Sequence, residues 1–143
     1  MKTKFKKFIF VLFTILCTTT FTSCISLSPD HFISPRWLIG TWGNSTVPTT
    51  TRFTISQNEI IRYKEIENVS STQSVVEEFT QWLSNNKNSY INYNEGSDSY
   101  SFVYHDDNLD IITKFEKIDD CTIKYSVNTN GKIQESIELT KVK

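Results

Sequence analysis

The chain has 143 residues, with 15 Lys and Arg against 16 Asp and Glu, and this balance excludes the strongly basic class of nucleic-acid-binding proteins. Aromatic residues make up 13% of the chain, and Thr, Ser, Ile and Val are abundant while alanine is absent, which favours strands over helices. The length predicts one domain.

The first residues have the order of an export signal. Four Lys lie within residues 2–7, and an apolar run of nine residues, 8–16, is followed by polar threonines. Nine residues are too few to span about 30 Å of hydrocarbon, because a helix rises 1.5 Å per residue. The segment therefore predicts a cleaved signal peptide, and since no second apolar run follows, we expect the rest of the chain to be exposed to water.

The run Phe21-Thr22-Ser23-Cys24 resembles the cleavage site of bacterial lipoproteins. This resemblance implies a signal peptide of residues 1–23 and acylation of Cys24 with two or three chains, palmitate among them, which would hold the protein firmly at a membrane of the cell envelope. Ile25 follows where Asp would indicate inner-membrane retention in enteric bacteria, so the outer membrane is favoured and the periplasmic or surface face stays open. The alternative is an ordinary signal peptide, which leaves Cys24 free or disulfide-bonded.

Cleavage changes the charge and the cysteine content. Removing residues 1–23 takes away four Lys and no acidic residue, which leaves 11 basic against 16 acidic side chains and a net charge of −5. Clustered cations for nucleic acid or anionic lipid are not expected on such a domain. With Cys24 acylated, Cys121 has no intramolecular partner, and its place in an alternating run with Ile123 and Tyr125 predicts a buried side chain.

The remaining chain shows mostly the period of strands. Residues 24–35, rich in Ser and Pro, predict a flexible tether before a single domain of residues 36–143. Alternation predicts eight strands, at residues 41–45, 50–56, 59–66, 90–94, 99–105, 110–118, 121–128 and 132–142, with a tight turn at Asn130-Gly131. Strands joined mainly to their neighbours indicate an up-and-down antiparallel sheet, curled or closed into a small β-barrel so that its edges are covered.

One helix is predicted at residues 74–84. Apolar residues at 75, 76, 79, 82 and 83 form one stripe, Ser74 and Glu77 have the spacing of a capping box, and Asn85-Asn86 can end the helix. We expect the helix to plug one mouth of the barrel or to lie over the sheet, burying Phe79 and Trp82. The alternative is a movable lid over a ligand cavity.

The run Gly40-Thr41-Trp42 resembles the start of lipocalin-like and other calycin barrels. The resemblance implies that Trp42 closes one end of a barrel, with a cation near the end of the last strand stacked over its ring. Lys141 is the matching candidate. Gly40 would let the chain enter the barrel closely.

A barrel of eight strands either fills with side chains or holds one small ligand. The strand pattern points ten bulky residues inward: Phe53, Ile55, Tyr100, Phe102, Tyr104, Phe115, Ile123, Tyr125, Ile137 and Leu139. If the interior is hollow, the candidate ligand contacts are Tyr100, Phe102, Tyr104, Tyr125 and Glu135, which shares the face of Ile133 and Ile137. Glu135 can equally reach solvent near the Gly131 turn.

The sequence offers no apparatus for catalysis, and we predict a protein that is not an enzyme and needs no cofactor. His31 lies in the tether, and His105 lies beside Asp106-Asp107. Neighbouring side chains on a strand point to opposite faces, so we predict that His105 and these two Asp residues do not form a metal site. Gly-rich phosphate loops, Gly-x-Ser-x-Gly and His-Glu-x-x-His are absent from the sequence.

Two hypotheses follow. The first is a membrane-anchored, lipocalin-like protein that binds a small apolar ligand in a cavity beneath the helix. The second is a filled barrel with a structural or protein-interaction role, such as a surface protein or an inhibitor of a host or envelope enzyme; small periplasmic lysozyme inhibitors are similar in plan. The volume of the cavity distinguishes them.

Overall fold

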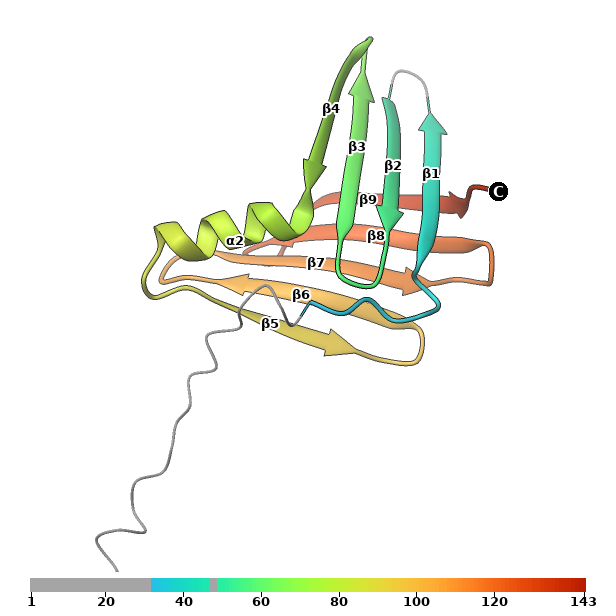
Figure 1. Ribbon diagram of the computed structural model, residues 1–143. Helices are drawn as coiled ribbons and strands as arrows, with labels where there is room; N and C mark the ends of the chain where they lie inside the picture. The colour runs from blue at the N-terminus through green and yellow to red at the C-terminus, as the bar shows by residue number, and fades with distance from the viewer. Residues whose placement is uncertain (1–31, 47–48) are drawn as a thin grey trace, which may run out of the picture.

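The computed structural model describes residues 32–46 and 49–143, which form one antiparallel sheet and a short helix (Figure 1). The predicted mainly β class is confirmed, but the sheet has nine strands where the sequence predicts eight. Within the described residues, no helix has the length and apolar character needed to cross a bilayer. The elements are β1 (Gly40–Thr46), β2 (Thr49–Ile55), β3 (Ile60–Ile66), β4 (Val69–Ser74), α2 (Val75–Asn85), β5 (Tyr90–Glu95), β6 (Ser99–His105), β7 (Asp110–Lys117), β8 (Thr122–Thr129) and β9 (Lys132–Lys141).

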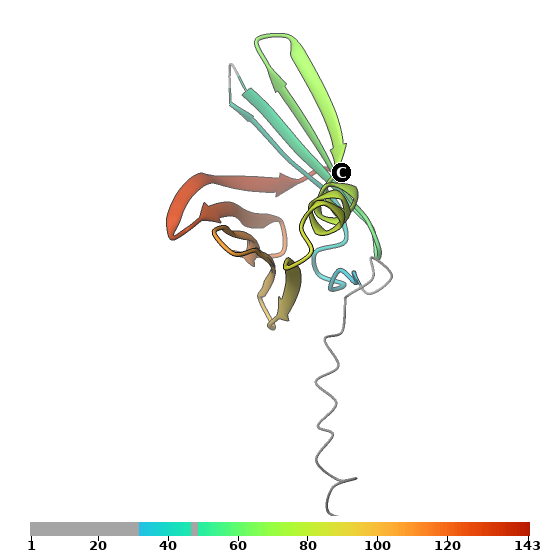
Figure 2. The same cartoon turned by 90° about the vertical axis from the view of Figure 1, so that its left-hand side faces the viewer.

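The strands follow the order β4-β3-β2-β1-β9-β8-β7-β6-β5, so the first and last strands are neighbours in the middle of the sheet. They pair at Trp42 with Lys141 and at Gly43 with Thr140. Figures 1 and 2 show that the sheet bends sharply into two leaves, β1–β4 and β5–β9, with α2 between them. The helix α2 connects β4 to β5, the two outermost strands of the sheet, and contacts β3 and β4.

The additional strand is β4. Its residues, Val69–Ser74, are mostly Ser, Thr and Gln, and nearly all of them are exposed on both faces. A strand with no buried face has no apolar alternation, which is the pattern from which strands are predicted. The turn before it is also inconspicuous, because Glu67 and Asn68 adopt positive φ values of 48° and 68° without a glycine.

The helix is where the sequence predicts it. The Ser74 Oγ accepts a hydrogen bond from the Glu77 backbone N–H at 3.0 Å and donates one to Glu59 Oε1 at 2.8 Å. The carboxylate that Ser74 contacts therefore comes from Glu59, just before β3, rather than from Glu77. At the other end, the N–H of Asn86 bonds the Trp82 carbonyl at 3.2 Å. Phe79 is buried by the packing of the apolar stripe, and Trp82 is half-buried.

The core lies between the two leaves. Nine of the ten residues predicted to point inward are buried, and Ile137 is half-buried against them. Their rings pack closely: the centroid of Phe53 lies 5.5 Å from that of Phe115 and 4.6 Å from that of Tyr125. Alternation along β2, β6, β7 and β8 produces this result, since every second side chain of these strands faces the opposite leaf.

The sequence predicts that the packed domain begins at Arg36, but in the structure packing begins earlier in the chain. Phe32 is buried, and its ring makes edge-on contacts with Tyr93, Tyr100 and Phe102 at centroid distances of 5.8–5.9 Å. The backbone N–H of Ser34 bonds the Gln57 carbonyl at 2.7 Å. Phe32, Ser34 and Pro35 are buried, so the packed domain begins at Phe32 rather than at Arg36.

Two further expectations are wrong for local reasons. Cys121 is exposed, because β8 begins one residue later and Cys121 belongs to the preceding turn, where its N–H bonds Asp119 Oδ1 at 2.7 Å. Ile133 does not share the inward face of Ile137 and is 70% exposed. The register of β9 shifts here, so that Gln134 is an extra residue between those opposite Asn128 and Val127. One added residue reverses the facing of every side chain beyond it.

Candidate functional site

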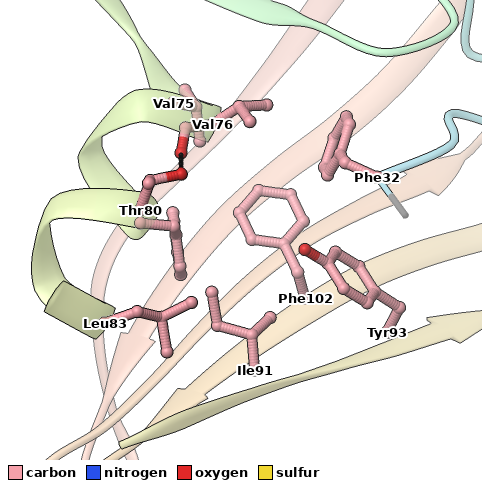
Figure 3. Close-up of a pocket in the computed structure, with 9 residues that line it drawn as sticks. Phe32, Val75, Val76, Thr80, Leu83, Ile91, Tyr93 and Phe102 are labelled. Atoms are coloured by element: carbon pink, nitrogen blue, oxygen red, sulfur yellow. Dashed lines mark hydrogen bonds between the residues drawn. The ribbon is translucent and has the colours of Figure 1, made fainter. Parts of the chain in front are cut away.

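The space directly beneath α2 is filled. Aromatic and aliphatic side chains from the helix, from β5, from β6 and from Phe32 converge there (Figure 3), and they leave a volume of only about 10 Å³. Such a volume is about that of one water-sized probe. The cavity that the ligand-binding hypothesis expects under the helix, lined by Tyr and Phe, is therefore closed, with Phe32 as one of the side chains that fill it.

A second space opens along the flank of α2 that carries Glu78 and Trp82. Its volume is about 240 Å³, and we call it the α2 cleft. It is enclosed by β3 from one leaf, by α2, and by β7, β8 and the bulge of β9 from the other leaf. Its lining residues are Arg62, Val75, Glu78, Phe79, Trp82, Ile111, Thr113, Tyr125, Val127, Thr129 and Gln134. The cleft thus combines an apolar wall with a small number of polar groups, as ligand sites do.

The charged groups of the cleft are Arg62 and Glu78. Arg62 projects from β3 and Glu78 from the first turns of α2, and Arg62 Nη2 lies 3.5 Å from Glu78 Oε2. The same Nη2 donates a hydrogen bond to Gln73 Oε1 on β4 at 2.8 Å. The two charged side chains are 25% and 19% exposed, so both remain within reach of a solute. Burial raises the pKa of the Glu78 carboxyl, and Arg62 opposes this rise.

The apolar wall and the floor come from opposite elements. Phe79 and Trp82 on α2 pack with their ring centroids 4.9 Å apart, while Tyr125 on β8 contributes a ring that is almost fully buried. Burial raises the pKa of Tyr125 to about 12, although the Arg62 guanidinium acts against it. Tyr125 is therefore a neutral hydroxyl at physiological pH, next to the positive charge of Arg62.

Of the five predicted ligand contacts, only Tyr125 lines the α2 cleft. Phe102 lies in the filled space beneath the helix. Tyr104 is buried, with its hydroxyl bonded to Asn86 Nδ2 at 2.9 Å and to Asp106 Oδ2 at 3.2 Å. Tyr100 is buried too, and among the described residues its hydroxyl has no hydrogen-bond partner; burial strongly raises its pKa. Glu135 Oε1 accepts a hydrogen bond from Lys64 Nζ at 3.0 Å, outside the cleft.

The three residues of the Gly-x-Trp resemblance lie together. The Nζ of Lys141 is 5.1 Å from the centroid of the buried Trp42 ring, and the indole Nε1 donates to the Leu38 carbonyl at 2.8 Å. Gly40 has a φ of 143°, and a Cβ at this position would lie 3.2 Å from Lys141 Cε. Glycine at position 40 therefore allows the ends of the first and last strands to approach each other closely.

Of the remaining candidates, the structure describes His105. His105 Nδ1 lies 2.6 Å from Asp110 Oδ1, and its ring stacks on Tyr90 at a centroid distance of 4.7 Å. In residues 32–46 and 49–143, no three His, Cys, Asp or Glu side chains converge as metal ligands. Cys24 and His31 lie outside the described residues.

Arg62 and Glu78 are absent from the residues that the sequence singled out. Sixteen positions separate them, one on a strand and one on a helix, and neither spacing nor motif connects them. The usable signal was weaker: Glu78 adjoins the apolar stripe of the helix, and Arg62 shares one face of its strand with the buried Ile60. Comparison with models of protein families, with curated proteins and with solved structures finds no match to this chain.

Proposed function

We propose that this chain is a lipid-anchored protein of the bacterial cell envelope whose β domain binds a small ligand in the α2 cleft and carries out no reaction on it. The observation that supports a binding role is the cleft itself, with about 240 Å³ between α2 and both leaves of the sheet. An aromatic and aliphatic wall next to an Arg, a Glu and several hydroxyl and amide groups is the composition of a recognition site.

We also propose that the curled sheet is a lipocalin-like barrel. Lys141 above Trp42 at 5.1 Å is the contact that the resemblance implies, and the pairing of the first strand with the last is a second observation that supports a barrel. In this interpretation α2 occupies the seam between β4 and β5, and the ligand enters beside it. The binding site is then beside α2, between β3 of one leaf and β7, β8 and β9 of the other.

The lipid anchor is inferred from the run Phe21-Thr22-Ser23-Cys24. We propose acylation of Cys24 and location at the outer membrane, on the periplasmic or the surface face. Since Phe32 is already part of the core, at most eight residue steps, or about 28 Å of extended chain, separate the acylated residue from the domain. If a Cys24→Ala chain were still cleaved and membrane-bound with unchanged mobility, the lipid anchor would be excluded.

Native mass spectrometry of the full chain, released from its membrane into a volatile buffer, tests the binding role. We expect a non-covalent adduct of small mass, which is lost when Trp82 is replaced by a residue that fills the cleft less well, such as Ala. A Tyr90→Ala chain is the control, because Tyr90 is an exposed aromatic residue away from the cleft. Absence of any adduct, together with no thermal stabilisation by a panel of small amphipathic compounds, would contradict the proposal.

A second candidate role, in protein interaction, is favoured by the edge strand β4. This strand is exposed on both faces and carries no charged residue, and such edges accept an added strand from a partner. Capture of envelope proteins on the immobilised full chain tests it, with Thr72→Pro as the variant that blocks strand addition, because Thr72 pairs with Tyr63 at a position whose N–H faces away from β3. Equal capture by both chains would exclude β4 as the contact.

A further inference from the structure

The Arg62–Glu78 pair in the α2 cleft leaves part of its bonding capacity unused. Guanidinium has five N–H donors and can bond a carboxylate through two of them at once. Here Nη2 donates to Gln73 at 2.8 Å, whereas its distance to Glu78 Oε2 is 3.5 Å, beyond the 2.7–2.9 Å that is usual for a charge-assisted bond. The pair is close enough to balance charge and too loose to exclude a competing ligand group.

The charges of the cleft constrain what the ligand can carry. Arg62 and Glu78 are the charged residues that line it, and together they are neutral. A ligand with a single charge would satisfy one member of the pair and leave the other facing a like charge in a half-buried site, which is unfavourable. A ligand with one positive and one negative group satisfies both.

The size and the apolar wall constrain the remainder of the ligand. A volume of about 240 Å³ is below the range of about 300–1,000 Å³ that is usual for drug-sized ligands. Beside the charged pair, the cleft offers the rings of Phe79 and Trp82 and the aliphatic side chains of Ile111 and Val127. A short apolar group fits this wall, whereas a long acyl chain exceeds the available volume.

We infer that the α2 cleft recognises a small zwitterion, an α-amino acid with an apolar side chain, whose carboxylate takes the Arg62 fork and whose ammonium group takes Glu78. The apolar side chain then lies against Phe79 and Trp82. The inference rests on the proposed binding function and names the class of ligand for the same cleft. Gln73 and Tyr125 act on Arg62: the first fixes its guanidinium through Nη2, and the second places a neutral hydroxyl beside it.

Calorimetric titration of the full chain in lipid nanodiscs tests this inference. L-leucine and L-phenylalanine are the probes, with their N-acetyl derivatives, which lack the ammonium group, and their amides, which lack the carboxylate. We expect each derivative to bind at least about ten-fold more weakly than the free amino acid, since each loses a hydrogen bond between charged groups. This comparison uses the unaltered chain and does not depend on the folding of a variant.

Two variants then assign the groups. Arg62→Gln should bind the amide as well as the acid, and Glu78→Gln should bind the N-acetyl derivative as well as the free amine. Lys64→Gln is the matched control, because Lys64 lies two residues from Arg62 on the same strand and forms its ion pair with Glu135 outside the cleft. Its affinities should stay within about two-fold of the unaltered chain, since the Lys64–Glu135 pair does not line the cleft.

The outcomes separate this inference from the proposed function. Equal affinity for the free amino acid and both derivatives, or binding of an uncharged apolar probe in preference to all of them, would overturn the zwitterion and leave a ligand cleft standing. Equal loss of binding in Lys64→Gln and in Arg62→Gln would show that the Arg62–Glu78 pair only stabilises the fold, and would overturn its role in contacting the ligand. No binding of any probe, with no adduct in native mass spectrometry, would refute both proposals.

Discussion

Replacing Phe32 by Ala tests whether the segment before β1 is a structural part of the domain. The Phe32 ring is 3% exposed and makes three edge-on aromatic contacts at 5.8–5.9 Å, each of a kind that contributes about 0.5–1.5 kcal/mol. The space around it has only about 10 Å³ to spare, so truncation creates a new cavity. Buried Phe→Ala changes cost about 3–5 kcal/mol.

We expect the lower part of that range. Residues 32–35 lie outside the regular strands, so the segment can partly collapse into the space, although the bond from Ser34 N to the Gln57 carbonyl holds it in place. A loss of about 3 kcal/mol corresponds to a decrease in Tm of about 12 °C for a domain of this size. The decrease should accompany an unchanged m-value, since the sheet itself stays folded.

Urea unfolding of the purified full chain, followed by tryptophan fluorescence, measures this loss. Ile33→Ala is the matched control, because Ile33 is the next residue and is 55% exposed, and its effect should stay within about 0.5 kcal/mol. A loss below about 1 kcal/mol for Phe32→Ala, or equal losses for the two variants, would refute the conclusion that the core begins at Phe32.

Three further predictions concern α2 and the meeting of the first and last strands. Ser74→Ala removes the hydroxyl that caps the helix and bonds Glu59, and should cost about 1–2 kcal/mol of unfolding free energy in urea; Ser84→Ala, an exposed site, should change little. Lys141→Gln removes the cation above Trp42 and should cost about 0.5–1 kcal/mol, with Lys141→Arg restoring it; equal loss in both would contradict the contact. Glu78→Gln should flatten the dependence of stability on pH. Burial raises the pKa of Glu78 above its ordinary 4.5, so the native state binds the carboxyl proton more tightly than the unfolded state does. The contribution of this protonation to the free energy of unfolding is therefore complete below pH 4.5 and is lost as the pH rises through the raised pKa. Urea midpoints measured from pH 4 to 8 check this, and a steeper dependence in the variant would contradict it.

Much of the fold follows from short-range patterns. Alternation in β2, β6, β7 and β8 predicts the inward rings of Phe53, Phe115 and Tyr125, and the structure confirms them as core. Asn130-Gly131 predicts a tight turn, and both residues adopt positive φ, 49° and 80°. The helix at α2 follows in the same way from its apolar stripe and from Ser74. Each of these features is encoded within a few neighbouring residues.

Other features have no local signal. β4 lacks a buried face, so its formation depends on β3 offering free backbone groups to pair with. The extra residue Gln134 in β9 turns Ile133 outward, although Ile133 lies an even number of positions from Ile137 and Leu139 in the sequence. Cys121 is exposed because β8 begins one residue beyond it. These outcomes depend on the register between strands, which is set by pairing partners far along the chain.

The sequence by itself determined eight of the nine strands and the helix, because propensity and periodicity act between residues a few positions apart. It also identified Cys24 as the predicted site of lipid attachment. Only the tertiary structure decided that the space beneath α2 is filled and that a cleft opens beside it. Arg62 and Glu78 meet there because the sheet bends and places β3 opposite the helix, and the way in which two distant faces pack is a property of the whole fold.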